Sequence, residues 1–116
     1  LADNKLLLDT IQTLIKISDS NHSFLYYNSP VTLLDDIMSK KIKVDILISD
    51  IQLQNDINGI ELVKRVNKII KKILIISNHN DYEYVKALLE LGVKGYLLKD
   101  KLEFLPQIIE IIIIKY

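Results

Sequence analysis

The sequence contains no cysteine, and this absence excludes disulfide bonds and thiolate metal sites within the chain. It also lacks an excess of either charge, because fifteen basic residues balance fifteen acidic residues. A balanced chain does not have the electrostatic attraction that draws proteins to nucleic acid or to an anionic membrane. No apolar run approaches the ~20 residues of a membrane span, and no signal peptide is recognisable. We therefore expect a cytoplasmic protein in which this chain makes no direct contact with nucleic acid or membrane.

The composition is typical of a folded domain. Hydrophobic residues make up 49% of the 116 residues, which is sufficient for one apolar core. We expect a single domain over residues 1–116. The chain has only Leu1-Ala2-Asp3 ahead of the first helical pattern, and it closes on the apolar segment IIIIKY. We expect strand residues missing before Leu1 and a further domain after Tyr116.

Apolar spacing predicts an alternation of helices and strands. Helical spacing predicts helices at residues 3–17, 31–40, 59–70 and 81–91, and a fifth from about residue 102 onward. Short β-type runs predict strands at residues 24–27, 45–49, 72–77 and 95–98. Within these runs, the segments ILI at 46–48 and ILII at 73–76 are continuously apolar, which is typical of parallel strands covered by helices on both faces. The sequence therefore predicts a doubly wound α/β domain.

Residues that start and stop helices agree with these ranges. Ser29 is suited to cap the second helix, with Pro30 at its first position. Asn80, three residues before Glu83, has capping-box spacing, and Gly92 lies where a helix terminator belongs. The second proline, at position 106, is compatible with the last helix only within its first turn, where backbone amides lack helical partners.

Polar residues follow the predicted strands at the point where each strand ends. Asp50, Ser77 and Lys99 end three strands, and Asp3 and Asn4 stand where a truncated first strand would end. Each has an ordinary explanation, since aspartates after strands form turns and either Asp3 or Asn4 would cap the first helix. Because the carboxyl ends of parallel strands meet at one edge of a sheet, we expect these residues to form a joint site.

Four motifs occur in a fixed order along the chain. They are Ala2-Asp3-Asn4, Ile48-Ser49-Asp50, Ile75-Ile76-Ser77 and Gly95-Tyr96-Leu97-Leu98-Lys99. In this order, and at strand ends, they resemble the receiver domain of two-component response regulators. The resemblance covers the whole chain except the start of the first strand. It implies a flavodoxin-like fold, with five helices and a five-stranded parallel sheet in the order 2-1-3-4-5, whose first strand is truncated here.

The resemblance also implies a phosphoryl acceptor and a cation. Asp50 would accept a phosphoryl group from a sensor histidine kinase, and Mg²⁺ would offset the charge that gathers there. Asp3, Asp50 and the backbone carbonyl of Gln52 would hold Mg²⁺, which prefers oxygen ligands. Asn4 stands at the position of a second acid, so one formal charge is lost and weaker metal binding is expected. A receiver that signals without phosphate is the alternative.

Three further residues would respond to the phosphoryl group. Lys99 would hold one phosphoryl oxygen as a point charge. The Ser77 hydroxyl would move to bond another oxygen, and Tyr96 would follow inward. Such a domain catalyses only its own phosphorylation and dephosphorylation, and the added charge biases a two-state element around the predicted fourth helix.

The region after the phosphoacceptor departs from the common pattern. Gly59 lies nine residues after Asp50, one more than is usual, and Gln54 stands where proline is common. Asn78 is bulkier than the usual alanine or glycine, and we expect it to narrow access to Asp50. His79 lies where such proteins tune hydrolysis.

The last predicted helix is apolar around nearly its whole circumference, at residues 108–109 and 111–114. A helix with one face in solvent normally carries a polar stripe. Either the excess is compositional, or the outer face packs on another chain or on a following domain. The resemblance favours a homodimer through the helix at 81–91, the strand at 95–98 and the last helix. The ending Leu98-Lys99-Asp100 is similar to regulators with a C-terminal helix-turn-helix output domain.

Other classes fit the sequence less well. One alternative is a receiver fold that acts only as a phosphorylation-independent interaction module. A phosphatase with an aspartyl nucleophile would want a second acid where Gln52 stands. A flavin carrier would want a Ser/Thr/Gly-rich phosphate loop where residues 3–6 lie.

Overall fold

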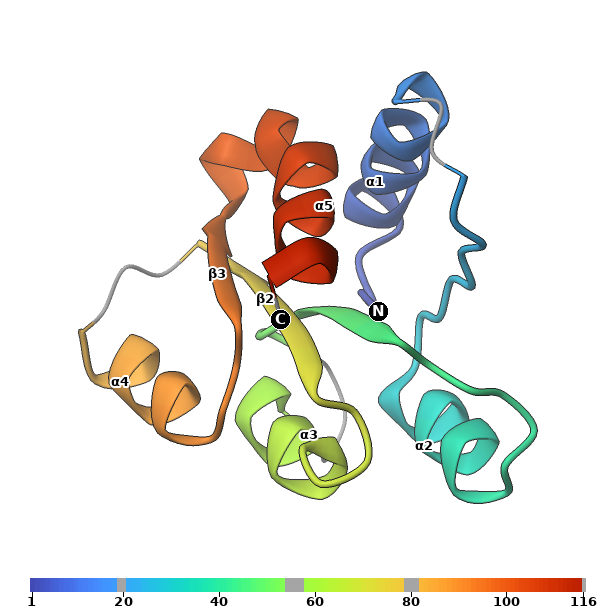
Figure 1. Cartoon of the computed structure of the whole chain (residues 1–116), viewed down its shortest axis with the longest axis vertical. Coiled ribbons are helices and arrows are strands. Elements are labelled where there is room, and N and C mark those ends of the chain that lie inside the picture. The colour runs from blue at the N-terminus through green and yellow to red at the C-terminus, as the bar shows by residue number, and fades with distance from the viewer. Residues whose placement is uncertain (19–20, 54–57, 79–81, 116) are drawn as a thin grey trace.

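The computed structural model describes residues 1–18, 21–53, 58–78 and 82–115 (Figure 1). Its elements are α1 (Lys5–Ile17), α2 (Pro30–Met38), β1 (Ile46–Asp50), α3 (Gly59–Val66), β2 (Lys72–Ser77), α4 (Tyr82–Glu90), β3 (Gly95–Leu98), a 3₁₀ helix η1 (Lys99–Phe104) and α5 (Leu105–Lys115). The predicted alternation of helices and strands is confirmed from α2 onward. The strands β2 and β3 have their predicted bounds.

The strands of the described residues form one parallel sheet in the order β1-β2-β3. Ile46 lies opposite Lys72, and Leu74 lies opposite Gly95. The connections between these strands contain α3 and α4, as parallel neighbours require. The flavodoxin-like arrangement is confirmed for this part of the sheet, and all three strands end at the same edge.

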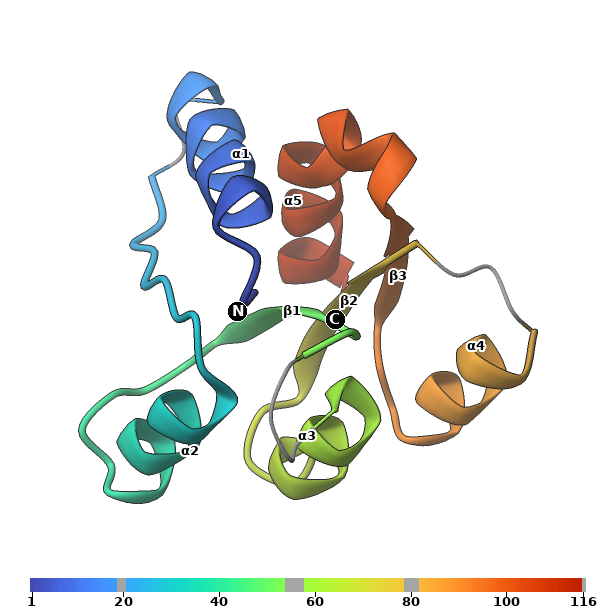
Figure 2. The ribbon, with the colours of Figure 1, turned by 180° about the vertical axis from the view of Figure 1, so that it is seen from behind.

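The sheet is covered on both faces. Side chains of β2 alternate between two cores: Ile73 and Ile75 pack with apolar residues of α2, α3 and α4, whereas Leu74 and Ile76 pack with those of α1 and α5. Figures 1 and 2 show the same three layers, with α2, α3 and α4 on one side of the sheet and α1 and α5 on the other. The continuously apolar strand therefore follows from burial on both faces.

The predicted strand at residues 24–27 is not formed. Leu1 instead pairs with β1 in the manner of a parallel strand, because its amino group donates to the Ile48 carbonyl at 2.6 Å and its carbonyl accepts from the Asp50 amide at 2.9 Å. On the other side, the Ala2 amide donates to the Tyr27 carbonyl at 3.1 Å. Within the described residues, the bond between Ala2 and Tyr27 is the only backbone hydrogen bond between these two segments, so a ladder is not present.

Two helices end earlier than predicted. α2 ends at Met38 because Lys40 adopts φ of 61°, and the Lys41 amide then donates to the Asp36 carbonyl in a Schellman arrangement. α3 ends at Val66, whose carbonyl accepts from the amides of residues 69 and 70 in a tight turn. Apolar spacing continues past the end of α3 at Ile69 and Ile70, which is why that predicted range was too long.

Three predicted helix signals lie in described residues. Ser29 occupies the cap position of α2 before Pro30, although its side chain makes no capping hydrogen bond. Gly92, with φ of 91°, terminates α4, and the Val93 amide donates to the Leu88 carbonyl. Pro106 lies in the first turn of α5, as predicted. The predicted cap at Asn80 and helix start at Asp81 lie outside the described residues.

The last helical segment has two parts. η1 begins directly after β3, and α5 follows from Leu105. The predicted helix from about residue 102 is formed, but α5 itself begins at Leu105, and the non-helical angles of Lys101 lie within η1, just before residue 102. Among the described residues, no helix combines the length and apolarity needed to cross a bilayer.

Candidate functional site

Asp50 is the last residue of β1 and is almost fully buried, with 3% of its surface exposed. Its backbone amide donates to the Leu1 carbonyl, which fixes the main chain on the outer side of β1. A buried carboxylate is costly unless partners satisfy it. The surroundings of Asp50 must therefore supply donors.

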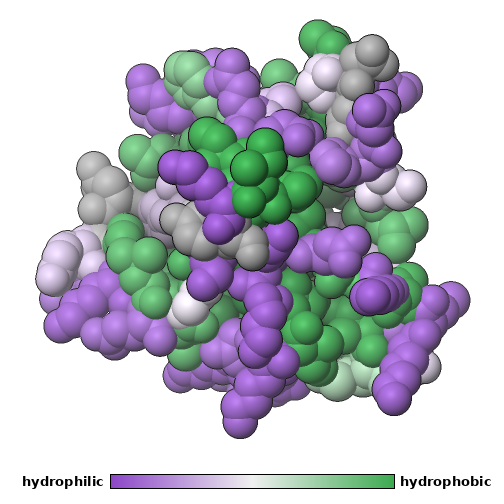
Figure 3. Space-filling model, viewed as in Figure 1, coloured by the Kyte–Doolittle hydropathy of each residue, from purple (hydrophilic) through white to green (hydrophobic). Residues whose placement is uncertain are grey.

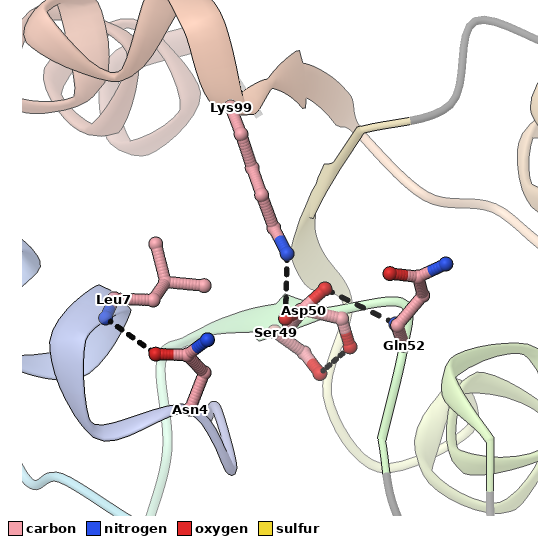
Figure 4. A network of polar contacts seen from close by, with 6 residues as sticks. All are labelled: Asn4, Leu7, Ser49, Asp50, Gln52 and Lys99. Atoms are coloured by element: carbon pink, nitrogen blue, oxygen red, sulfur yellow. Dashed lines mark hydrogen bonds and ion pairs between the residues drawn. The ribbon is translucent and has the colours of Figure 1, made fainter.

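Two donors reach the Asp50 carboxylate, one at each oxygen (Figure 4). The Lys99 ammonium donates to Oδ2 at 3.0 Å, and the Gln52 backbone amide donates to Oδ1 at 3.1 Å. The Lys99 side chain is 21% exposed, and that of Asp50 is 2% exposed. The pair links the end of β1 to the residue that follows β3, across the intervening strand β2.

The strand register explains why Asp50 and Lys99 meet. Asp50 pairs with Ile76, and Ser77 pairs with Leu98, which directly precedes Lys99. The predicted convergence of Asp50, Ser77 and Lys99 at one edge of the sheet is therefore present in the geometry. Ser77 is fully buried at the end of β2.

Tyr96 lies further back in β3, opposite Ile75. It is half-buried and packs against the core that α2, α3 and α4 form. This position places its ring on the α3–α4 side of the sheet.

Asp3 and Asn4 lie at the start of α1. The Asn4 side chain is exposed, and its Oδ1 accepts a hydrogen bond from the Leu7 amide at 3.1 Å, which makes Asn4 the N-cap (Figure 4). Of the two interpretations that the sequence left open for Asn4, the helix cap is the one seen here. Asp3 is partly buried beside the buried Ala2.

The donor chemistry of the site suits a hard divalent cation in part. The carboxylates of Asp3 and Asp50 and the backbone carbonyl of Gln52 are oxygen ligands of the type that Mg²⁺ takes. Within the described ranges, no three His, Cys, Asp or Glu side chains group closely enough to hold a metal ion. Mg²⁺ held by these oxygens would have few protein ligands and would keep several waters.

Ser49 belongs to the motif Ile48-Ser49-Asp50, but no role was predicted for its side chain. Ser49 is fully buried in β1, and its hydroxyl donates to the Asp50 carbonyl at 2.9 Å. A serine inside an otherwise apolar strand is the only signal that could have indicated it. The predictions for Gln54 and His79 lie outside the described residues.

Comparison with known proteins agrees with this geometry. The family model of the response regulator receiver domain matches residues 1–110. The transcriptional regulatory protein DegU of Brevibacillus brevis is 35% identical over 65 residues, which are 53% of this chain and 26% of DegU. The chain thus spans about a quarter of this curated relative.

Two solved structures share the fold. The isolated REC domain of RcsB from Salmonella enterica serovar Typhimurium, with phosphomimetic BeF₃⁻, has a TM-score of 0.82 at 20% identity, over 94% of this chain and 81% of that chain. A DNA-binding response regulator of the LuxR family from Staphylococcus aureus has a TM-score of 0.80 at 20% identity, over 96% and 88%. With the family match over residues 1–110, and with Asp50 paired to Lys99 at the strand ends, this chain belongs to the response regulator receiver domains.

Proposed function

We propose that Asp50 is the phosphoacceptor of this receiver domain and that a sensor histidine kinase is its phosphoryl donor. An Asp50 carboxylate oxygen attacks the phosphorus of a phosphohistidine, a P–O bond forms, and the P–N bond breaks. The histidine ring leaves and takes up a proton, and Asp50 becomes an acyl phosphate. The observation that carries this proposal is the ion pair between Lys99 and the buried Asp50 carboxylate at 3.0 Å.

The charges around Asp50 decide whether an anionic donor can approach. Carboxylate attack on a phosphoryl group brings like charges together, and Lys99 offsets part of that charge at the transferred oxygens. Asp3, Asp50 and the Gln52 carbonyl would hold Mg²⁺, which supplies further charge neutralisation when bound.

Ser77 and Tyr96 are the proposed switch residues. The Ser77 hydroxyl, buried at the end of β2, would turn to donate a hydrogen bond to a phosphoryl oxygen. Tyr96, half-buried on the α3–α4 side, would then move inward. The phosphate adds about −1.5 to −2 charges, by analogy with phosphorylated hydroxyls, and this biases the position of α4.

The full protein is proposed to be larger than this chain. Residues before Leu1 would extend the pairing seen at Leu1 into a first strand, and residues 24–27 would then form an edge strand, which gives five strands in the order 2-1-3-4-5. A C-terminal output domain, which binds DNA by analogy with DegU and the LuxR-family regulator, would read the switch. Its place of action would be the cytoplasm.

A homodimer through α4, β3 and α5 is the proposed response to phosphorylation. Figure 3 shows apolar surface where α5 lies. Ile111 and Ile114 are exposed on α5, Phe104 is exposed on η1, and Leu89 is exposed on α4. Exposed apolar side chains gathered on one face are typical of an interaction surface.

The test is phosphorylation of the purified chain. With Mg²⁺ and a small phosphodonor, we expect an acid-stable, base-labile adduct on the unmodified chain and none on Asp50→Asn. Asp45→Asn is the matched control, because Asp45 is an exposed acid just before the same strand and its loss should leave the adduct intact. An adduct that persists in Asp50→Asn would overturn the site assignment.

One observation favours a second function, a phosphorylation-independent interaction module. Asn4 replaces a charged residue at the cation site and caps a helix instead. Absence of any adduct, with beryllofluoride also failing to bind, would support this second function over the first.

A further inference from the structure

Asn4 has one oxygen atom in its side chain, and this oxygen is used to cap α1. Oδ1 accepts the Leu7 amide at 3.1 Å and thereby satisfies one of the free N–H groups at the start of α1. The other arm of the amide is an NH₂ group, which only donates hydrogen bonds and cannot bind a cation. A metal would have to share the oxygen with the helix cap.

The surroundings of that oxygen oppose such sharing. The N-terminus of α1 carries the positive end of the helix dipole, equivalent to roughly +0.5 elementary charge. A neutral amide does not compensate this charge, whereas a carboxylate would. An aspartate at this position would also have two oxygens, one for the Leu7 amide and one for the cation.

A second asparagine in the chain has the same local role. Asn58 caps α3, and its Oδ1 accepts the Glu61 amide at 2.9 Å. Both asparagine side chains are exposed, and each accepts a hydrogen bond from the backbone amide three residues further along the chain. Helix capping therefore accounts for the conformation of Asn4 without any metal.

Resting on the proposed phosphoacceptor function, we infer that Asn4 positions α1 and gives the divalent cation no ligand. The cation is then held by two side-chain carboxylates, those of Asp3 and Asp50, together with the Gln52 carbonyl and water. It shares Asp50 with Lys99, which is already bonded to Oδ2. The site is consequently a weak one whose occupancy varies with the concentration of free Mg²⁺.

The test is direct cation binding, measured with Mn²⁺ as the spin probe by the loss of its free electron paramagnetic resonance signal. Asn4→Asp should tighten Mn²⁺ binding about tenfold or more, because it adds a charged ligand and keeps the cap. Asn4→Ser also keeps the cap but cannot ligate through an amide. Its dissociation constant should stay within about twofold of that of the unchanged chain.

Asn58→Asp and Asn58→Ser are the matched controls, since they make the same changes at the cap of α3. They should leave the Mn²⁺ dissociation constant within about twofold of that of the unchanged chain. Thermal melting measures the contribution of the cap to stability independently of metal binding. The melting temperatures of the Ser and Asp variants should be close to that of the unchanged chain. Asn4→Ala removes the cap and should have a lower melting temperature.

Two outcomes would overturn the inference. Weaker Mn²⁺ binding in Asn4→Ser, with melting unchanged, would make Asn4 a ligand after all. No gain in Asn4→Asp would show that charge at this position does not limit the site. Because no phosphodonor is present, failure of Asp50 to be phosphorylated would count against the proposed function and not against this inference.

Discussion

Gly59 is required at its position because it has no side chain. Its amide donates to the Ile51 carbonyl at 2.9 Å, and a Cβ added at Gly59 would lie 2.5 Å from the Ile51 Cα. The start of α3 therefore packs directly on the chain that leaves the site. The nine-residue spacing from Asp50 departs from the usual pattern, yet this close approach still requires glycine.

Removing the Lys99 ammonium tests the central ion pair at the residue scale. Lys99→Met keeps most of the stem but leaves the Asp50 Oδ2 without this donor, and we expect the free energy of unfolding to fall by about 1–3 kcal/mol. Urea denaturation at neutral pH measures the change. The control is Lys101→Met, an exposed lysine of the same 3₁₀ helix, which should change stability by less than about 0.5 kcal/mol. Equal stability of both variants would show that the pair contributes nothing to folding.

Part of the site was predictable from the residues that stand at the ends of the strands. Asp50, Ser77 and Lys99 were predicted because strand ends of a parallel sheet converge, and the register places them together. The choice between cap and ligand at Asn4 was not predictable, because both use the same oxygen. Ser49 was missed because a serine in a strand has many ordinary explanations.

At the scale of elements, side chains from distant segments donate hydrogen bonds to backbone carbonyls near the ends of helices. Lys72, at the start of β2, donates from Nζ to the Ile113 carbonyl at 3.1 Å, near the end of α5. A cation at this place satisfies a free carbonyl and complements the negative end of the helix dipole. The side chain of Asn67, the C-cap of α3, similarly donates to the Leu91 carbonyl after α4.

The segment at residues 24–27 is tied to α2 by one such contact. The Tyr27 hydroxyl donates to Asp36 Oδ2 at 2.6 Å, and this hydrogen bond raises the pKa of Tyr27 above its ordinary value of 10.0, with smaller contributions from burial and from the Asp36 charge. We predict that Asp36→Asn lowers the pKa of Tyr27. A pH titration of the tyrosine ring signals by NMR measures it.

The raised pKa of Tyr27 also makes the stability of the fold depend on pH. The fold favours the protonated phenol, so this contribution is fully present below about pH 10 and is lost as the pH rises through the folded-state pKa of Tyr27. Asp35→Asn, at the exposed neighbouring position, should leave the Tyr27 titration unchanged. A Tyr27 pKa that is the same in both variants would contradict the assignment of Asp36 as the cause.

At the scale of the whole molecule, the apolar surface on α5 is expected to join two copies. Ile111 is 50% exposed, and Ile111→Glu should raise the dimer dissociation constant by about tenfold or more while leaving the fold intact. Sedimentation of the chain with Mg²⁺ and beryllofluoride measures this. Leu6→Glu is the control, because Leu6 is an apolar, 76% exposed residue on α1, which is not one of the elements of the proposed α4–β3–α5 interface. A chain that stays monomeric with beryllofluoride bound would contradict the proposed dimer.

The sequence by itself determined the alternation of elements, the two-sided burial of β2 and the strand ends at which polar residues gather. These features follow from local spacing, because burial on both faces requires continuously apolar strands. Only the tertiary structure decided that residues 24–27 share a single backbone hydrogen bond with Ala2, since each bond of a ladder needs a partner on the neighbouring segment. It also decided that Lys99 bonds Asp50 and that Asn4 caps α1, because a side chain's partner depends on which distant atoms the fold brings within reach.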